Sequence, residues 1–95
     1  MPKGYLVAHI RAHDMEKMQA FRALAGPAIA KYNGTVLVNA PDPEIKEGPE
    51  SGISVVVEFE SLDMARQFYH SDEYGAARAI REQAAQTDLL LAEGL

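Results

Sequence analysis

The segment ISVVVEF at residues 53–59 decides the fold, because it carries the strongest strand pattern in the chain. β-Branched and aromatic residues fit the pleated surface of a sheet, and they make up most of this segment. Successive side chains of a strand point to opposite faces. One face of the segment is wholly apolar and should pack on helices, whereas the other face is mixed. The apolar face carries Ile53, Val55, Val57 and Phe59, and the mixed face carries Ser54, Val56 and Glu58.

Three further strands and two helical regions flank this segment. Asp14 can cap a first helix, which Pro27 should kink or break because proline removes a backbone donor. Ser61 starts a second helical region, and Ser71 can cap it again before it ends near residue 85. The remaining strands are expected at residues 4–11, 35–40 and 89–93.

The element order β-α-β-β-α-β predicts an α+β, ferredoxin-like fold. This fold has a four-stranded antiparallel sheet with both helices on one face. In its usual strand order, 4-1-3-2, the strands at 4–11 and 53–59 lie side by side in the centre of the sheet.

Length and composition exclude several classes of protein. The 95 residues predict one domain over residues 1–95, and 47% hydrophobic with 24% charged residues excludes general disorder. There are no cysteines, which excludes a disulfide framework, a thiolate nucleophile and a cysteine zinc site. The apolar stretches are far shorter than the ~20 residues of a membrane helix, and the chain does not start like a signal peptide. We therefore expect a cytoplasmic protein that binds no membrane.

The charge of the chain is unevenly distributed. Nine basic and 14 acidic residues give a net charge of −5, and residues 41–60 alone account for it. An acidic chain without a basic face argues against binding nucleic acid. Within this acidic stretch, residues 41–52 include three prolines and two glycines, so they should form an irregular, solvated loop.

The first strand also has two different faces. The mixed sets of residues 4–11 and 53–59 should share the face without helices. Such a face is too apolar at Tyr5, Val7 and Val56 to be ordinary solvent surface, and a short chain gains from covering it with a second subunit. The sequence thus predicts a homodimer in which two sheets meet face to face. In the first strand, Leu6, Ala8 and Ile10 point one way, and Tyr5, Val7, His9 and Arg11 point the other.

His9 and Glu58 are the candidate catalytic residues on this mixed face. A histidine titrates near neutral pH and is suited to general base catalysis, and a partly buried glutamate needs a partner. Tyr5 and Arg11 share the face and are candidate binding residues. The alternative stays open that His9 is an interface histidine satisfied by hydrogen bonds.

A second set of candidate binding residues lies on the last helical region. Tyr74, Arg78 and Arg81 recur at helical spacing, and an arginine offers a fork of donors to a carboxylate or phosphate. The same stripe could instead form ion pairs with neighbouring carboxylates or the acidic loop. Tyr69 and Tyr74 flank the break at Ser71, where free backbone N–H groups could hold a small anion or be capped by the serine. No cofactor motif is present, and the three histidines do not form a metal-binding pattern.

Several segments carry a resemblance to a known family. GYLVAHIR, AKYNG, VVVEF, and above all ARQFYHSDEYGAARAIR followed by DLLLAEG, are similar to the domain-of-unknown-function 1330 family. The resemblance covers nearly the whole chain, and FYHSDEYGAAR is its most specific part. Typical members have tryptophan where Phe68 stands here, and a basic residue just before the third strand, where this chain has Glu50-Ser51-Gly52.

The resemblance implies a dimeric α/β barrel, the architecture of the superfamily that contains this family. Relatives in that superfamily include cofactor-free monooxygenases, isomerases, dehydratases and haem enzymes, and fold alone does not choose among them. Two functions stay open. The first is a homodimer that binds a small organic molecule in a cleft beside the sheet, with cofactor-free acid/base catalysis by His9 and Glu58. The second is a non-catalytic ligand-sensing or accessory dimer.

Overall fold

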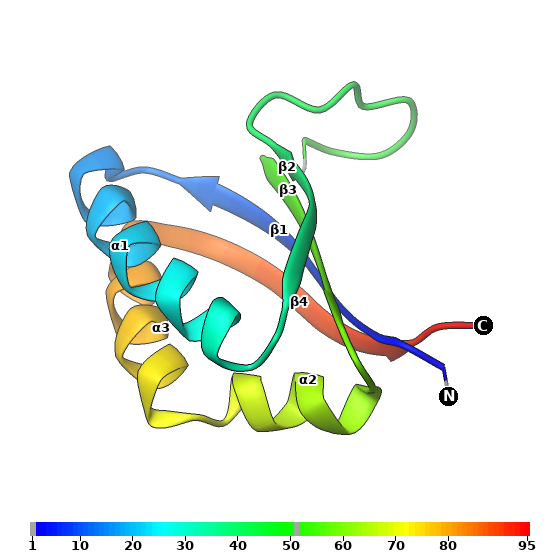
Figure 1. Cartoon of the computed structure of the whole chain (residues 1–95). Coiled ribbons are helices and arrows are strands. Elements are labelled where there is room, and N and C mark those ends of the chain that lie inside the picture. Colours follow the sequence, from blue (N-terminus) through cyan, green and yellow to red (C-terminus); the bar gives the residue numbers. More distant parts are fainter. Residues whose placement is uncertain (1, 51) are drawn as a thin grey trace.

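The computed structural model describes residues 2–50 and 52–95. It consists of one antiparallel sheet with helices packed against one of its faces (Figure 1), as the sequence predicts. The elements in chain order are β1 (Gly4–Ala12), α1 (Met15–Lys31), β2 (Thr35–Ala40), β3 (Ile53–Phe59), α2 (Leu62–Tyr69), α3 (Asp72–Ala84) and β4 (Ala85–Glu93).

The sheet has the strand order β2-β3-β1-β4, which confirms the predicted ferredoxin-like arrangement. The central strand β1 pairs with β3 and with β4, both antiparallel. Its register places Tyr5 opposite Glu58 and His9 opposite Ser54. The alternation of β1 then sends Leu6, Ala8 and Ile10 into the core beneath the helices, where all three are buried.

Aromatic side chains hold the helices against the sheet. Phe68 of α2 lies between Phe59 of β3 and Tyr74 of α3, with ring centroids 5.0 Å and 4.5 Å away. Tyr32, just after α1, meets the same ring edge-on at 6.2 Å. Phe68 is 1% exposed, so it joins all three helices to the core at one point.

The expected break at Pro27 is wrong, because α1 continues through it to Lys31, and a kink there stays a prediction. Proline removes the hydrogen bond to the carbonyl four residues earlier, that of Ala23, and its ring crowds the same carbonyl. Ala23 and Gly26 are exposed, so water can satisfy that carbonyl. Beyond the proline, Ala28 is buried against the core, and this packing keeps the last turn helical.

The C-terminal half departs from the expected pattern at one boundary. Ser71 does cap α3, since its Oγ accepts a hydrogen bond from the Tyr74 amide at 3.1 Å, and the second helical region is therefore two helices. However, β4 begins at Ala85, four residues before the expected start at residue 89. Residues 85–88 lack a strand pattern of their own, and pairing with Ile10, Arg11 and Ala12 of β1 extends the strand.

A bulge interrupts β2 at the edge of the sheet. Val36 pairs with Val57 and Val38 with Val56, so Leu37 is an extra residue without a pairing partner on β3. Strict alternation would place Val36 and Asn39 on opposite faces. The bulge instead brings both residues to the face that carries the helices.

The acidic loop between β2 and β3 projects away from the helices (Figure 1). Residues 41–50 contain neither helix nor strand and are almost entirely exposed, as expected for a solvated loop. The loop returns to the sheet at Gly52, whose φ of +76° is unfavourable for other residues. A Cβ there would also collide with the carbonyl oxygen of Ile10.

Among the described residues, no helix combines the length and the apolar character that crossing a membrane requires.

Replacing residues 42–49 by a short Gly-Ser turn should change the free energy of unfolding by less than ~2 kcal/mol, because loop closure depends weakly on length. Urea denaturation measures this change. Gly52→Ala is the contrasting variant and should destabilise more than the deletion, since its Cβ meets the backbone of β1. A larger loss from the deletion would show that the loop is docked.

Candidate functional site

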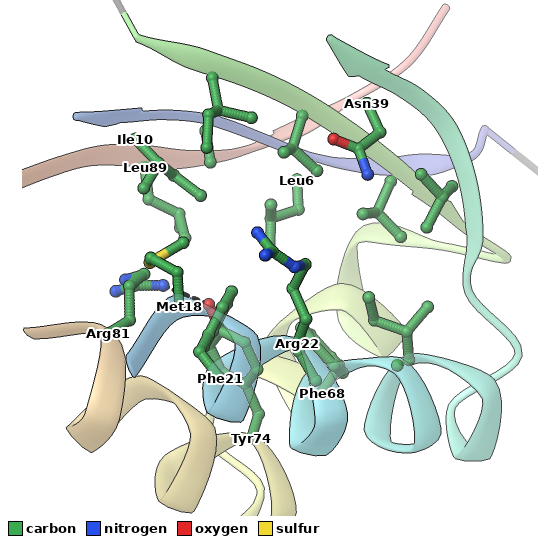
Figure 2. A pocket seen from close by; sticks show the side chains of 18 residues that line it. Leu6, Ile10, Met18, Phe21, Arg22, Asn39, Phe68, Tyr74, Arg81 and Leu89 are labelled. Atoms are coloured by element: carbon green, nitrogen blue, oxygen red, sulfur yellow. Dashed lines mark hydrogen bonds between the residues drawn. The ribbon is translucent and has the colours of Figure 1, made fainter. Parts of the chain in front are cut away.

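A cavity of about 250 Å³ lies between the inner face of the sheet and α1. Apolar side chains from the strands line its upper wall, among them Leu6, Val55 and Leu89. Phe21 of α1 lines the wall below them (Figure 2), and Ile29 of the same helix also lines the cavity. Pockets of this kind, mostly apolar with a few polar groups, are the usual sites of small-molecule binding.

The exposure of the lining residues shows which end of the cavity is open. Arg22 of α1 and Val36 and Asn39 of β2 are exposed, so the mouth lies between α1 and the sheet edge. Tyr74 and Arg81 of α3 are buried at the inner end. Figure 2 shows Arg22 extending from α1 toward the strands, and Arg81 beside Met18.

Arg81 is the buried charged residue of the core and is 5% exposed. One of its terminal nitrogens donates a hydrogen bond to the Tyr74 hydroxyl, whereas its Nε is buried without a partner. Its guanidinium carbon lies 5.8 Å from the ring centroid of Phe21 and 5.9 Å from that of Tyr74. No carboxylate forms an ion pair with it in the described part of the chain.

Local sequence explains why these two groups meet. Tyr74 and Arg81 are seven residues apart, two turns of α3, and therefore lie on one face of it. Ala77 between them is fully buried, and its small side chain lets α3 pack closely. Burial raises the pKa of Tyr74 above its usual value even though Arg81 opposes this shift. The hydroxyl is therefore protonated at neutral pH.

The outer face of the sheet carries most of the sequence-predicted site residues, on the side away from the cavity. An apolar row crosses all four strands, and polar side chains lie on both sides of it. Glu58 accepts a hydrogen bond from the Tyr5 hydroxyl at 2.9 Å, and His9 Nδ1 lies 3.3 Å from Ser54 Oγ. The apolar row contains Val38, Val56, Val7 and Leu90.

The polar groups of this outer face are already partnered within the subunit. The hydrogen bond to Glu58 raises the pKa of Tyr5 above its usual value, and burial and the carboxylate charge add to the shift. Arg11 pairs with Asp88 of β4 at 3.0 Å. His9 and Glu58 do not line the cavity. Their catalytic roles, and the binding roles of Tyr5 and Arg11, stay predictions.

Some of the candidate binding residues on the helices line the cavity and others do not. Tyr74 lines the cavity, whereas Arg78 lies over the Tyr69 ring, 5.1 Å from its centroid, and pairs with Glu82 at 3.4 Å. Tyr69 and Arg78 do not line the cavity. At the break between α2 and α3, Ser71 Oγ accepts from one amide and donates to the carbonyl of Phe68 at 2.6 Å, so the serine occupies the place expected for a small anion.

Two cavity residues, Arg22 and Asn39, were not among the candidates from the sequence. Arg22 has the sequence context of an ordinary solvated helix residue, and only the position of α1 relative to the sheet shows that it lines the cavity. Asn39 reaches the cavity through the bulge at Leu37, which alternation does not predict. Arg81 shared its spacing pattern with Arg78, and burial alone separates the two.

No group of three or more histidine, aspartate or glutamate side chains within residues 2–50 and 52–95 could hold a metal ion.

A family model described as a domain of unknown function, DUF1330, matches residues 3–95. The chain belongs to the DUF1330 family. This match confirms the resemblance carried by segments such as FYHSDEYGAAR. No protein of curated function matches the sequence significantly.

Solved structures of similar fold place this DUF1330 chain among ferredoxin-like proteins. RPA0582, a protein of unknown function from Rhodopseudomonas palustris, has a TM-score of 0.78 at 17% identity, covering 99% of this chain and 83% of its own. A dimeric ferredoxin-like protein of unknown function from Bacteroides fragilis has a TM-score of 0.65 at 16% sequence identity, and the match covers 96% of this chain and 95% of that protein. SnoaB, a cofactor-independent oxygenase from Streptomyces nogalater, has a TM-score of 0.67 at 11% sequence identity, and the match covers 97% of this chain and 92% of SnoaB. At these identities the likeness establishes the fold.

His9→Gln tests which role the histidine has in this DUF1330 protein. Because His9 lies on the face away from the cavity, we expect the variant to retain any ligand held there. Loss of the hydrogen bond between His9 and Ser54 should instead reduce stability by about 1–3 kcal/mol. Thermal melts and size measurements check this, and Ser54→Ala, which removes the other partner, should give a similar shift. Lost ligand binding or turnover with unchanged stability would assign His9 a role in binding or in catalysis, respectively.

Proposed function

We propose that this protein is a homodimer in which each subunit binds a small, largely apolar organic molecule in the cavity between α1 and the sheet. The observation that carries the proposal is the cavity itself, whose walls are apolar side chains from the sheet and α1. Its inner end has the polar groups of Tyr74 and Arg81, which can orient a bound molecule.

The size of the cavity fits a small ligand. An apolar cavity of roughly 150 Å³ is sufficient for benzene. The 250 Å³ between the sheet and α1 therefore holds a molecule of about one ring and a small substituent. Exposed residues at the mouth, Arg22 and Asn39, give such a molecule a route from solvent.

The outer face of the sheet supports the dimer. Its apolar row includes Leu90, which is 53% exposed, and Val38, which is 42% exposed. A second copy placed sheet to sheet would cover this row, and the polar rows on either side would form the rim of the interface. The Bacteroides fragilis protein of the same fold is described as dimeric. In this arrangement the two cavities face away from the interface.

A cofactor-free reaction on the bound molecule is the second candidate function. It rests on the fold shared with SnoaB, which is described as a cofactor-independent oxygenase. The described residues that line the cavity include no histidine, aspartate or glutamate, and Tyr74 is protonated at neutral pH. Because these groups supply no ordinary general base, the geometry supports binding better than acid/base catalysis.

Val56→Lys should convert the dimer into a monomer. Val56 lies in the middle of the apolar row, where two copies would each have to bury an unpaired ammonium group. Sedimentation should give a mass near 10.4 kDa for the variant and twice that for the wild type. Leu24→Lys is the control, because Leu24 is also a partly exposed apolar residue but lies on α1. A monomeric wild type at micromolar concentration would contradict the proposed dimer.

Val55→Phe should block the cavity. Val55 lines it from β3, and a larger ring there would occupy the space while gaining packing contacts. We expect binding of benzyl alcohol and of benzoate to weaken at least tenfold, measured by calorimetry, with an unchanged or higher melting temperature. Val56→Phe is the matched control, because the next residue points to the outer face and should leave binding intact. Equal binding by both variants would place the probes outside the cavity.

A further inference from the structure

We infer that the molecule bound in this cavity is a small apolar monocarboxylate whose carboxylate is held by Arg81. This inference rests on the proposed binding function and names the chemical class of its ligand. The class consists of acids with one carboxylate and an uncharged aromatic or short aliphatic body.

The first argument is the unmatched charge of Arg81. A guanidinium has five N–H donors and remains charged at any physiological pH. Here it is 5% exposed, gives one hydrogen bond to a neutral hydroxyl, and leaves Nε buried without an acceptor. Buried charges normally have a counter-ion, so this one indicates a site built to receive an anion.

The surroundings of Arg81 compensate for its burial only in part. The rings of Phe21 and Tyr74 lie within cation–π distance, and Arg81 stands in the last turn of α3, where the helix dipole favours a positive charge. Neither interaction supplies an acceptor to Nε. A carboxylate can accept from two guanidinium nitrogens at once, which matches the donors that remain.

The second argument is the charge of the whole lining. Among the described lining residues, the charged ones are Arg22 and Arg81, both positive, in a chain whose net charge is −5. Arg22 stands at the mouth, opposite the amide of Asn39 on the sheet edge (Figure 2). The cavity thus presents positive charge at both its entrance and its inner end, which attracts an anion from solvent.

The rest of the lining specifies the body of the ligand. Between the two arginines the walls are aliphatic and aromatic, for example Ile10, Val55 and Phe21. An inorganic anion would leave this apolar surface unfilled, and a neutral hydrocarbon would leave Arg81 without an acceptor. A molecule with a single carboxylate at one end satisfies both parts of the cavity.

The test compares two probes that share a ring, one with a charged carboxylate and the other with a neutral hydroxymethyl group. Benzoate and benzyl alcohol have the same ring, and calorimetry of the wild-type protein should give benzoate at least tenfold tighter binding at neutral pH. Acetate and inorganic phosphate, which lack the apolar body, should bind at least tenfold more weakly than benzoate. This comparison uses the wild-type protein alone.

Arg81→Met then identifies the group responsible. We expect this variant to lose the preference for benzoate while binding benzyl alcohol at least as well as the wild type. Its melting temperature should stay equal or rise, because an apolar side chain replaces a buried charge. Arg78→Met is the matched control on the same helix, outside the cavity, and should retain the preference.

Several results would overturn the inference. Equal binding of benzoate and benzyl alcohol by the wild type would do so while leaving the proposed binding function intact. Acetate or phosphate binding as tightly as benzoate would show a general anion site without selection for an apolar body. A preference retained in Arg81→Met, or a marked drop in its melting temperature, would make Arg81 a structural residue. Failure of both ring probes to bind would overturn the proposed binding function as well.

Discussion

The two-residue alternation of β1, fixed by pairing along both of its edges, is the constraint on which the rest of the structure depends. With β3 on one side and β4 on the other, β1 cannot slip by a residue without exchanging its two faces. Leu6, Ala8 and Ile10 are thereby committed to the helices, and Tyr5, Val7 and His9 to the outer surface. The cavity and the apolar row of the outer face therefore lie on opposite sides of one layer of backbone.

This constraint also explains how much the sequence could predict. Strand order follows from the order of the elements, the division of faces follows from local alternation, and both were correct. The catalytic candidates were sought on the mixed face, because His9 and Glu58 supply recognisable chemistry there. The cavity arises instead from the distance between α1 and the sheet, which no periodicity records. Likewise, Arg78 and Arg81 share one spacing pattern, and only tertiary packing buries Arg81 and leaves Arg78 at the surface.

The inner end of the cavity holds a buried charge beside unfilled space. A core of this size would be more stable with an apolar residue in place of Arg81 and with the cavity filled. Phe68, bound by aromatic contacts to Phe59 and Tyr74, keeps the helices fixed around that defect. The packed aromatic rings give the unfilled space beside them rigid walls, which a preformed cavity needs.

The bulge at Leu37 separates the length of the edge strand from the identity of the residues at the mouth. Because Leu37 has no pairing partner on β3, a chain lacking this residue would still direct Val36 and Asn39 to the face that carries the helices. A chain that drew Leu37 into register would turn Asn39 outward, moving its amide from the mouth of the cavity to the outer face of the sheet. The position of a single irregular residue thus decides which side chain stands at the mouth of the cavity, while the central strands remain unchanged.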